Sequence, residues 1–329
     1  MHRVTVDLPY ELPVHPRPGR EVLRVVREGR FDVVHAHFGV LAPFAEGALP
    51  ALVRAGVPLV VTVHSLWGPA VGLFRLADLA ARWTRWPAVF TAVSDAAARP
   101  VRAALGGRAE VDVLPNGIDP HAWRLDPTPS EGTPGRTPEC SPDEVLLVTA
   151  MRLAPRKRPL PLLEALQEVR VGLPAQVRLR AVVAGEGPRR TAMERYLRRH
   201  GMDWVEMPGR LGPDALRALY ARADLYVAPA VLEAFGIAAL EARTAGLPIV
   251  ARAGTGIAEF VEDGIEGLLA PSDPGLADAV ERLVTDPALR TRIAAHNRTT
   301  TPAATWDEAV ARSVTAYERA VDLVAAVAR

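Results

Sequence analysis

Residues 225–245 read LYVAPAVLEAFGIAALEARTA and contain one complete strand–loop–helix unit. The apolar run Leu225–Ala228 predicts a short buried strand, and the alanine-rich stretch Gly236–Ala245 predicts a helix. Residues 229–235 between them carry a proline and a glutamate, which is typical of a loop. Strands that alternate with helices in this way form parallel sheets covered by helices on both faces.

The same alternation runs through most of the 329 residues. Further apolar runs predict strands at Arg3–Leu8, Asp32–Ala36, Leu59–Val63, Val89–Val93, Val111–Leu114, Val145–Ala150, Leu179–Ala184, Asp203–Glu206 and Ile249–Ala253. Amphipathic stretches predict helices at Arg20–Glu28, Pro43–Ala55, Val71–Trp83, Leu162–Val169, Arg189–His200, Asp214–Arg222, Leu276–Ala295 and Asp307–Ala328. Ser94 and Asp95 follow one of the strands and indicate the N-cap of a further helix. The fold class is therefore α/β.

A proline-rich segment interrupts the alternation once. Residues 127–142 read PTPSEGTPGRTPECSP, without periodicity or aromatic residues, which is a linker composition. We predict two Rossmann-like, doubly wound domains: residues 1–121, then a linker over 122–142, then residues 143–300, with C-terminal helical residues at 301–329. A ligand is expected in a cleft between the two domains, outside the carboxyl ends of their strands.

Composition excludes several classes of protein. Lys plus Arg is 39 against 38 for Asp plus Glu, so no strong basic field favours nucleic acid as a partner. The single cysteine, Cys140, cannot form an internal disulfide, and no Cys–His cluster indicates zinc. Residues 1–20 lack a secretory h-region, and prolines break the longest uncharged run, residues 55–74, so it is not a membrane span. A reducing, cytoplasmic setting is expected.

Two glutamates flank the start of the helix quoted first. Glu233 lies in the loop, and Glu241 lies in the second turn of the helix. Backbone N–H groups of residues 235–237 have no intrahelical acceptor and favour an anion. Two carboxylates beside an anion site suit a molecule with both hydroxyls and phosphate. The alternative is two surface glutamates and a core aromatic at Phe235.

Two further loops follow predicted strands. Arg152 and Lys157 form a basic loop that can reach a diphosphate. A solvated loop is the alternative, but Lys157 is the only lysine of the chain, which favours a function. Gly185-Glu186-Gly187-Pro188 allows a ligand to approach the backbone closely. It is not the dinucleotide pattern G-x-G-x-x-G, because Arg190 stands at the third glycine position.

Histidines follow strands of the first half. His64 ends a strand at the same sheet edge and can contact a phosphate or a sugar, although a lone histidine is more often structural. His35 and His37 alternate along one strand and face one side. No third ligand is evident for a metal, and no D-x-D pair is present to hold a metal on a diphosphate.

Together, five motifs resemble those of the retaining GT-B glycosyltransferases of the GT4 type. They are R-L-x-x-x-K, G-E-G-P, E-A-F-G with a glutamate eight residues after the first, G-x-x-E before E-D-G-x-x-G, and P-N-G-I-D. The resemblance runs from about Asp32 to the C-terminus. It implies two Rossmann-like domains facing a cleft and transfer of a sugar from a nucleotide-diphosphate-sugar to an acceptor. Retained anomeric configuration and independence of metals or other cofactors are implied as well.

The resemblance also implies roles for individual residues. Arg152 and Lys157 hold the diphosphate, Glu233 binds sugar hydroxyls, Glu241 binds ribose hydroxyls, and His64 reaches the donor from the first domain. The candidate catalytic residues are His64, Arg152, Lys157 and Glu233. The candidate donor-binding residues are Gly185, Glu186, Gly209, Arg210, Phe235, Gly236, Ile237 and Glu241.

Family members usually begin with a strand, a glycine-rich loop and a long helix on the acceptor side. This chain begins with residues that resemble a later strand, so the N-terminal domain is expected to be incomplete. Two alternatives therefore stand beside a transferase. One is a nucleotide-sugar-binding protein with a degenerate acceptor domain. The other, an epimerase or phosphorylase, is disfavoured because no second lysine is available for a pyridoxal Schiff base.

Two expectations concern surfaces. As in the family, the C-terminal helix is expected to cross back onto the first domain, through a face with Val310, Val314, Tyr317 and Val321. Leu66–Pro87 interleaves aromatic residues with arginines, and it is expected either to pack on its own sheet or to meet a lipid headgroup layer or hydrophobic acceptor. The acceptor is a glycan, a lipid or a small molecule. Peripheral contact with the inner face of the membrane is the alternative to a purely cytoplasmic location.

Overall fold

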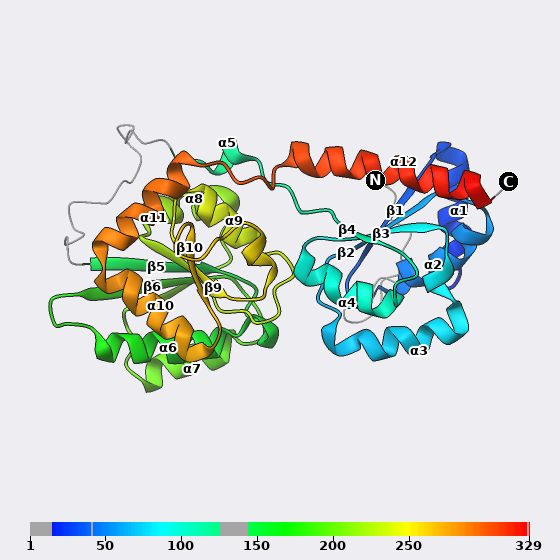
Figure 1. The fold of residues 1–329 in the computed structure, drawn as a ribbon. Coiled ribbons are helices and arrows are strands. Elements are labelled where there is room, and N and C mark those ends of the chain that lie inside the picture. Colours follow the sequence, from blue (N-terminus) through cyan, green and yellow to red (C-terminus); the bar gives the residue numbers. More distant parts are fainter. Residues whose placement is uncertain (1–14, 41, 126–143, 328) are drawn as a thin grey trace. The chain divides into compact units, whose positions relative to one another are not determined.

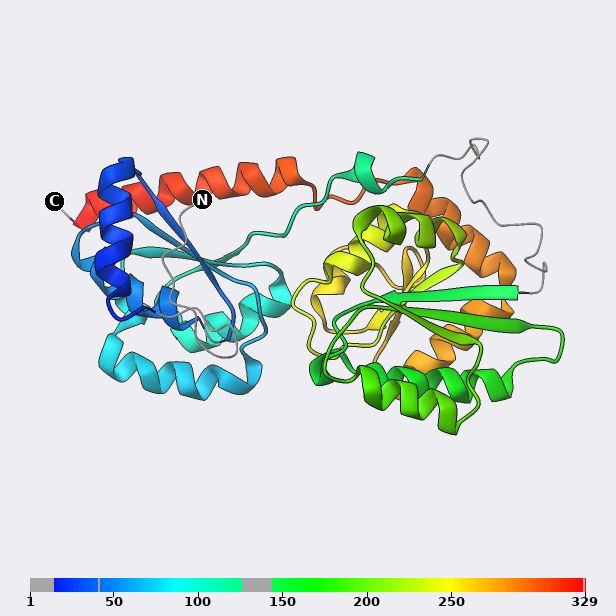
Figure 2. The same cartoon turned by 180° about the vertical axis from the view of Figure 1, so that it is seen from behind.

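The computed structural model describes residues 15–40, 42–125, 144–327 and 329, and the chain divides into two compact units (Figures 1 and 2). Unit 1 comprises Met1–Gly117 and Trp306–Arg329, and unit 2 comprises Ile118–Thr305. The predicted strand Arg3–Leu8 and the predicted linker at 127–142 lie outside the described residues.

Unit 1 is built on a parallel sheet of four described strands in the order β1-β2-β3-β4. The strands are β1 (Val34–Phe38), β2 (Leu59–Val63), β3 (Ala88–Ala92) and β4 (Val111–Val113). The helices are α1 (Pro18–Gly29), α2 (Pro43–Arg54), α3 (Val71–Ala81), α4 (Asp95–Leu105) and α12 (Trp306–Val327). Every residue of β2 and β3 is buried, because helices cover both faces of the sheet, with α12 on one side and α3 on the other (Figure 1).

Unit 2 has a six-stranded parallel sheet in the order β10-β9-β8-β5-β6-β7. The strands are β5 (Glu144–Ala150), β6 (Arg178–Ala184), β7 (Val205–Gly209), β8 (Leu225–Ala228), β9 (Ile249–Arg252) and β10 (Gly267–Ala270). The helices are α5 (Pro120–Trp123), α6 (Pro159–Gly172), α7 (Arg190–Arg199), α8 (Pro213–Arg222), α9 (Ile237–Thr244), α10 (Asp273–Thr285) and α11 (Pro287–Thr299). Helices α6, α7 and α10 lie together on one face (Figure 1).

The order of the strands in unit 2 creates a topological switch point. The chain moves outward from β5 through β6 to β7, and then returns to place β8 on the other side of β5. The loops after β5 and β8 therefore leave the same sheet edge and diverge to opposite faces. Ligands of doubly wound sheets bind at such a point.

The α/β class and the parallel sheets are confirmed, whereas several predicted boundaries are wrong. The sequence patterns did not predict the strand β10. The predicted helix Leu276–Ala295 is two helices, because Pro287 cannot continue a helix and the Asp286 side chain accepts a hydrogen bond from Leu289 N at 2.9 Å. The Ser94 cap is confirmed: its Oγ accepts from Ala97 N at 3.0 Å.

The boundary between the units also differs from residue 121. Unit 1 ends at Gly117, and the short helix α5 belongs to unit 2. The reason is that α5 packs on α9 and also contacts α8, where the Trp123 and Tyr220 ring centroids are 5.9 Å apart.

The C-terminal helix α12 returns to unit 1 as predicted and packs on β2 and β3, but of the four residues of the predicted face only Tyr317 packs against the sheet. Val310, Val314 and Val321 are 58%, 46% and 42% exposed. The buried positions are Ala309, Ala316 and Ala320, with Val60 and Val89 of the sheet against the latter two. Alanine has no side chain beyond Cβ, so it lets the helix approach the sheet closely.

Ala320→Leu is therefore expected to destabilise unit 1 by about 1–3 kcal/mol through overpacking, because Ala320 is fully buried. Urea unfolding of the full chain measures this change. Val321→Leu, which adds one methylene at an exposed neighbour, serves as the control and should stay within about 0.5 kcal/mol. Equal stability of the two variants would contradict the close approach of α12.

Candidate active site

The loops at the switch point of unit 2 meet in an ion pair. A short 3-10 turn at Pro155–Lys157 follows β5, and the Lys157 ammonium donates to the Glu233 carboxylate from the loop after β8. Both side chains are largely buried, at 22% and 16% exposed. The structure thus brings together the residue predicted to hold the diphosphate and the one predicted to bind the sugar.

A pocket of about 390 Å³ lies beside the ends of β5 and β6. Four of the predicted site residues line it: Arg152, Gly185, Glu186 and Arg210. Ala150, Met151, Ala184, Leu211 and Leu216 complete the lining. Arg152 is exposed to solvent, and within the part of the chain that the structure describes its guanidinium makes no ion pair that an anion would have to displace.

The glycines of this region allow the chain to pack against itself. Gly185 has a φ of +140°, and a Cβ there would lie 1.9 Å from the Met151 carbonyl oxygen. At Gly209, with a φ of +85°, a Cβ would lie 2.8 Å from a carboxylate oxygen of Glu186. The sequence predicts that Gly185 allows a ligand to approach the backbone closely. The structure adds a second reason for a glycine here, because the backbone at Gly185 lies against the loop after β5.

Arg190, at the position of the missing third glycine, orients Glu186. Its guanidinium donates to the carboxylates of Glu186 and Glu194 at 2.7 and 2.8 Å and to the Met207 carbonyl at 3.0 Å. Sequence reasoning treated Arg190 only as the failure of a motif. An arginine four residues after a glutamate was the available signal for this ion pair.

Helix α9 begins directly after the Glu233 loop. Gly236 at its N-cap has a φ of +95°, and a Cβ there would lie 2.6 Å from the Ile257 side chain. Phe235 is buried against Phe260, with ring centroids 5.5 Å apart, so only its backbone can face a ligand. Ile237 starts the helix, where the first-turn N–H groups lack intrahelical acceptors. These features place the predicted anion site at the same edge as Lys157.

Glu241 is an unpaired carboxylate on α9. Among the residues that the structure describes, its side chain has no hydrogen-bond or ion-pair partner, and burial raises its pKa to about 7. Its electrostatic neighbours include Tyr220 and Tyr226, whose pKa values burial raises further above neutrality. A half-buried carboxylate without a donor is suited to hydroxyl groups that a ligand would bring.

The raised pKa of Glu241 predicts the pH dependence of stability. The folded carboxyl keeps its proton up to about pH 7, while the unfolded one loses it near 4.5, so this group lowers stability as pH rises through that window. Glu241→Gln should therefore stabilise the chain by about 1–3 kcal/mol at pH 8 and have little effect near pH 4. Denaturant unfolding at both values measures this, with exposed Glu168→Gln as control. An equal effect at both pH values would contradict the assignment.

Tyr226 connects the two central strands at the site, and sequence reasoning missed it. Its hydroxyl donates to the Ala150 carbonyl at 3.0 Å, which ties β8 to the last residue of β5. Tyr226 is buried, and no local pattern distinguishes it from an ordinary core aromatic.

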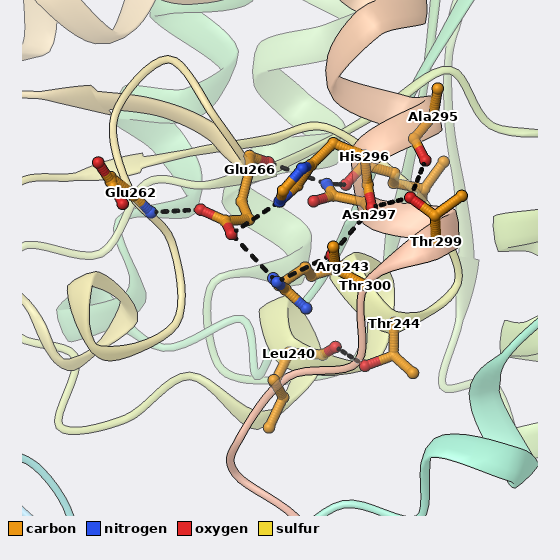
Figure 3. Close-up of polar contacts among 11 residues, drawn as sticks. Leu240, Arg243, Thr244, Glu262, Glu266, Ala295, His296, Asn297, Thr299 and Thr300 are labelled. Carbon is orange, nitrogen blue, oxygen red and sulfur yellow. Dashed lines mark hydrogen bonds and ion pairs between the residues drawn. The ribbon is translucent and has the colours of Figure 1, made fainter.

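A buried polar network also fixes α9 from behind (Figure 3). Arg243 of α9 donates to Glu266 at 3.2 Å, and Glu266 is 3.1 Å from the His296 ring of α11. The Asn297 amide donates to the carbonyls of Leu247 and Glu266 at 2.8 and 2.9 Å. Asn297 is one of only two asparagines of the chain, and this rarity was the one available signal.

The predicted histidine site belongs to unit 1. His64 follows β2, and its Nε2 lies 2.8 Å from Nδ1 of His37. His35, on the same side of β1 as His37, contacts the hydroxyls of Thr62 at 2.6 Å and Tyr317 at 3.0 Å. The pKa of each histidine is lowered, first by desolvation and, for His35 and His64, then by neighbouring rings, so the cluster is uncharged at neutral pH.

Within the described ranges, no group of three or more His, Cys, Asp or Glu side chains is arranged to hold a metal. In these same ranges no helix is long and apolar enough to cross a membrane.

Only the two ends of the segment Leu66–Pro87 pack inward, and no residue of α3 between them is buried. Trp67 and Trp83 are buried, and the Arg75 guanidinium donates to the Ala103 carbonyl at 2.6 Å. Of the two alternatives for this segment, Trp83 follows the first, because its ring is buried inside unit 1 against Phe90 of the sheet. Membrane contact by other residues of the segment stays a prediction.

The fold and this site define a doubly wound α/β protein of two Rossmann-like units, with the candidate site at the switch point of unit 2. Residues 138–300 match the family described as glycosyl transferases group 1, and residues 1–122 match glycosyltransferase family 4. A D-inositol 3-phosphate glycosyltransferase of Actinosynnema mirum is 30% identical over 322 residues, which span 90% of this chain and 74% of that protein. The chain therefore belongs to glycosyltransferase family 4 and is a glycosyltransferase.

Two further similarities are informative. An alpha-D-kanosaminyltransferase of Streptomyces kanamyceticus is 37% identical over 128 residues, which span 38% of this chain and only 33% of that protein. The crystal structure of Anabaena HepE, in complex with UDP and glucose, superposes with a TM-score of 0.67 at 22% identity, over 96% of this chain and 83% of that one. The latter likeness shows a shared GT-B fold.

Proposed function

We propose that this glycosyltransferase transfers a sugar from a nucleotide-diphosphate-sugar to an acceptor hydroxyl, with retention of configuration and without a metal ion. The observation that carries the proposal is the Lys157–Glu233 ion pair at the switch point, between the Arg152 pocket and the start of α9. The Anabaena relative bound to UDP and glucose supports a nucleotide-sugar donor.

Charge at the site suits departure of a diphosphate. Cleavage of the bond between the sugar and the phosphate builds negative charge on the leaving group, which Lys157, Arg152 and the N-terminus of α9 stabilise. A donor phosphate competes with Glu233 for the Lys157 ammonium. The freed Glu233 carboxylate then accepts hydrogen bonds from sugar hydroxyls, so binding of phosphate and sugar are coupled through one ion pair.

The remaining residues hold the rest of the donor. Glu241 accepts from the ribose hydroxyls, which satisfy its unpaired carboxylate. Gly185, Glu186, Gly209 and Arg210 line the nucleotide side, and Arg190 keeps Glu186 in place. His64 contributes from unit 1.

We propose that the configuration is retained because the acceptor attacks the anomeric carbon from the same face of the sugar as the leaving phosphate. Once it is freed from Lys157, the Glu233 carboxylate is assigned to the sugar hydroxyls and not to the anomeric carbon, so the proposal includes no covalent intermediate of the kind formed by retaining glycosidases. The acceptor oxygen bonds to the anomeric carbon as the bond to the phosphate breaks, and the acceptor proton passes to the departing phosphate oxygen.

The proposal is tested first by donor binding and turnover. Thermal shifts with UDP-, GDP- and ADP-glucose identify the nucleotide, because a ligand that binds the folded state raises the unfolding temperature. Donor hydrolysis is then compared with and without added acceptors, and NMR of the product reads the anomeric configuration. Donor binding without turnover under any condition would favour the binding protein over the enzyme.

EDTA is expected to leave turnover unchanged, because the fixed cations Arg152 and Lys157 supply the charge that a metal would otherwise provide. The measurement is the initial rate in chelator and after adding back Mg²⁺ or Mn²⁺. A strict requirement for either ion would overturn the metal-independent mechanism.

A further inference from the structure

A network of ion pairs lies next to Lys157 at the carboxyl edge of the unit 2 sheet. Arg158, the residue after Lys157, donates to the Asp273 carboxylate at the start of α10. Arg252, the last residue of β9, donates to the same carboxylate at 3.1 Å and to the Pro271 carbonyl at 2.9 Å. One carboxylate therefore connects the loop after β5 to the ends of β9 and β10.

The backbone of Arg158 has a conformation that arginine rarely adopts. Its φ and ψ are +56° and +46°, in the left-handed region. Among the residues that the structure describes, the other two non-glycine residues with a positive φ, Arg30 and Arg82, directly follow α1 and α3, where this conformation commonly ends a helix. Arg158 instead joins the short turn Pro155–Lys157 to α6. Such a conformation persists only where neighbouring contacts hold it.

The ion pair with Asp273 is the side-chain contact that holds Arg158. In the ranges covered by the structure, no other group accepts a hydrogen bond from this guanidinium, and its Nε is buried without a partner. Isolated surface ion pairs contribute little to stability, but this carboxylate also pairs with Arg252, whose side chain is only 12% exposed. The network is therefore anchored at the end of β9 and is not a contact between two fully exposed side chains.

The same network reaches the loop that carries Glu233. The Thr255 hydroxyl donates to the Arg252 carbonyl at 2.8 Å. The N–H of the next residue, Gly256, donates to the Glu233 carbonyl at 2.9 Å. Asp273 is thus connected to both loops that form the ion pair at the switch point.

We propose that Asp273 is a positioning residue for Lys157: through its ion pair with Arg158 it holds the left-handed turn that directs the ammonium to the donor diphosphate. This inference rests on the proposed function, since it concerns the residue that would bind the leaving group. Without the carboxylate, the guanidiniums of Arg158 and Arg252 lie close to each other without a counter-charge. Arg158 also loses the contact that offsets its unfavourable backbone conformation, so the turn relaxes and the ammonium moves away from the diphosphate.

Asp273→Asn is expected to lower kcat about tenfold with a smaller change in KM, because asparagine keeps the shape of the side chain but removes its charge. In a chain that already carries Lys157→Ala, the same substitution should change kcat by less than twofold, since Asp273 acts through Lys157. A residue needed only for folding would lower kcat by the same factor in both backgrounds, and that result would overturn the positioning role.

Glu206→Gln is the matched control for the loss of a carboxylate. Glu206 of β7 pairs with Arg180 of β6, and both side chains are about half exposed, as Asp273 is. This control should keep kcat within twofold. Thermal unfolding of both variants establishes that they fold.

Two substitutions of Arg158 separate the role of the backbone from that of the charge. Both remove the ion pair and the cation. Arg158→Ala leaves a residue that disfavours the left-handed region, whereas Arg158→Gly leaves one that adopts this region readily. The kcat of Arg158→Gly should therefore be at least threefold higher than that of Arg158→Ala. Equal values would overturn the inference, because they would assign the effect to the cation itself.

The position of Lys157 can also be measured without turnover. Lys157 is the only lysine of the chain, so isotope labelling of lysine gives the NMR signals of one side chain. In Asp273→Asn these signals should move toward those of a free lysine and sharpen, because the ammonium loses its fixed surroundings. In Glu206→Gln they should not change. Unchanged signals in Asp273→Asn would overturn the inference whatever the activity of the chain.

These measurements separate the two proposals. Turnover of a nucleotide-sugar that depends on Lys157 but is the same in Asp273→Asn would leave the glycosyltransferase mechanism standing and refute the positioning role. If the unsubstituted chain turned over no nucleotide-sugar, the proposed function would fail, and with it the assignment of this turn to a diphosphate.

Discussion

Lys157→Ala is expected to lower kcat about 10²- to 10³-fold, with a smaller change in KM. Negative charge develops on the diphosphate only as this group leaves, and the lysine would stabilise that charge. Removing the lysine should therefore raise the energy of the transition state more than that of the bound donor. The substitution also leaves Glu233 without its ion-pair partner. Steady-state kinetics with the donor chosen by thermal shift measure the effect, and Arg152→Ala should lower kcat more than tenfold for the same reason.

Arg156→Ala is the matched control, because Arg156 is an exposed cation in the same short turn. It should keep kcat within twofold. Lys157→Arg retains the charge and should recover part of the loss. A kcat of Lys157→Ala within twofold of that of the unsubstituted chain would refute the proposal that this loop binds the diphosphate.

Gly185→Ala is expected to destabilise unit 2 by about 3 kcal/mol or more. The new Cβ would lie 1.9 Å from the Met151 carbonyl oxygen, and a φ of +140° is strained for any L side chain. Either β6 or the loop after β5 must shift, and both line the donor pocket. Urea unfolding and hydrogen exchange of the strands of unit 2 measure the loss of stability. The variant is also expected to bind the donor more weakly.

Gly212→Ala provides the comparison. A Cβ at Gly212 would meet nothing within 4 Å, and no positive φ is required there. Its stability should change by no more than about 0.5 kcal/mol. If Gly185→Ala were as mild as Gly212→Ala, the close contact between the two loops would be refuted.

Local patterns indicated most of the candidate site. Glu233 and Glu241 became candidates because a strand, a loop and a helix follow one another within 21 residues, and each element has its own composition. Lys157 became a candidate because it is the only lysine. The partners that fix these residues were not found. Tyr226 and Arg190 act through contacts to distant backbone carbonyls, and no spacing in the sequence encodes such contacts.

Surface and core were harder to separate. Val310 and Val314 form an apolar stripe at helical spacing, yet α12 buries its alanines instead. Periodicity gives the direction of an apolar face, but the distance between helix and sheet decides which side chains fit between them. For Trp83 the sequence left core and interface open, because aromatic residues between arginines suit either.

The sequence by itself determined that this protein is a parallel α/β chain, and it indicated the loop–helix unit of the candidate site, because hydrophobic period, turn residues and caps act over a few neighbours. Only the tertiary structure decided the order of the strands. That order puts β8 beside β5 and so joins Lys157 to Glu233, which are 76 residues apart. Strand order depends on which buried surfaces fit together across the whole sheet, and that non-local packing energy is not written in any one stretch of residues.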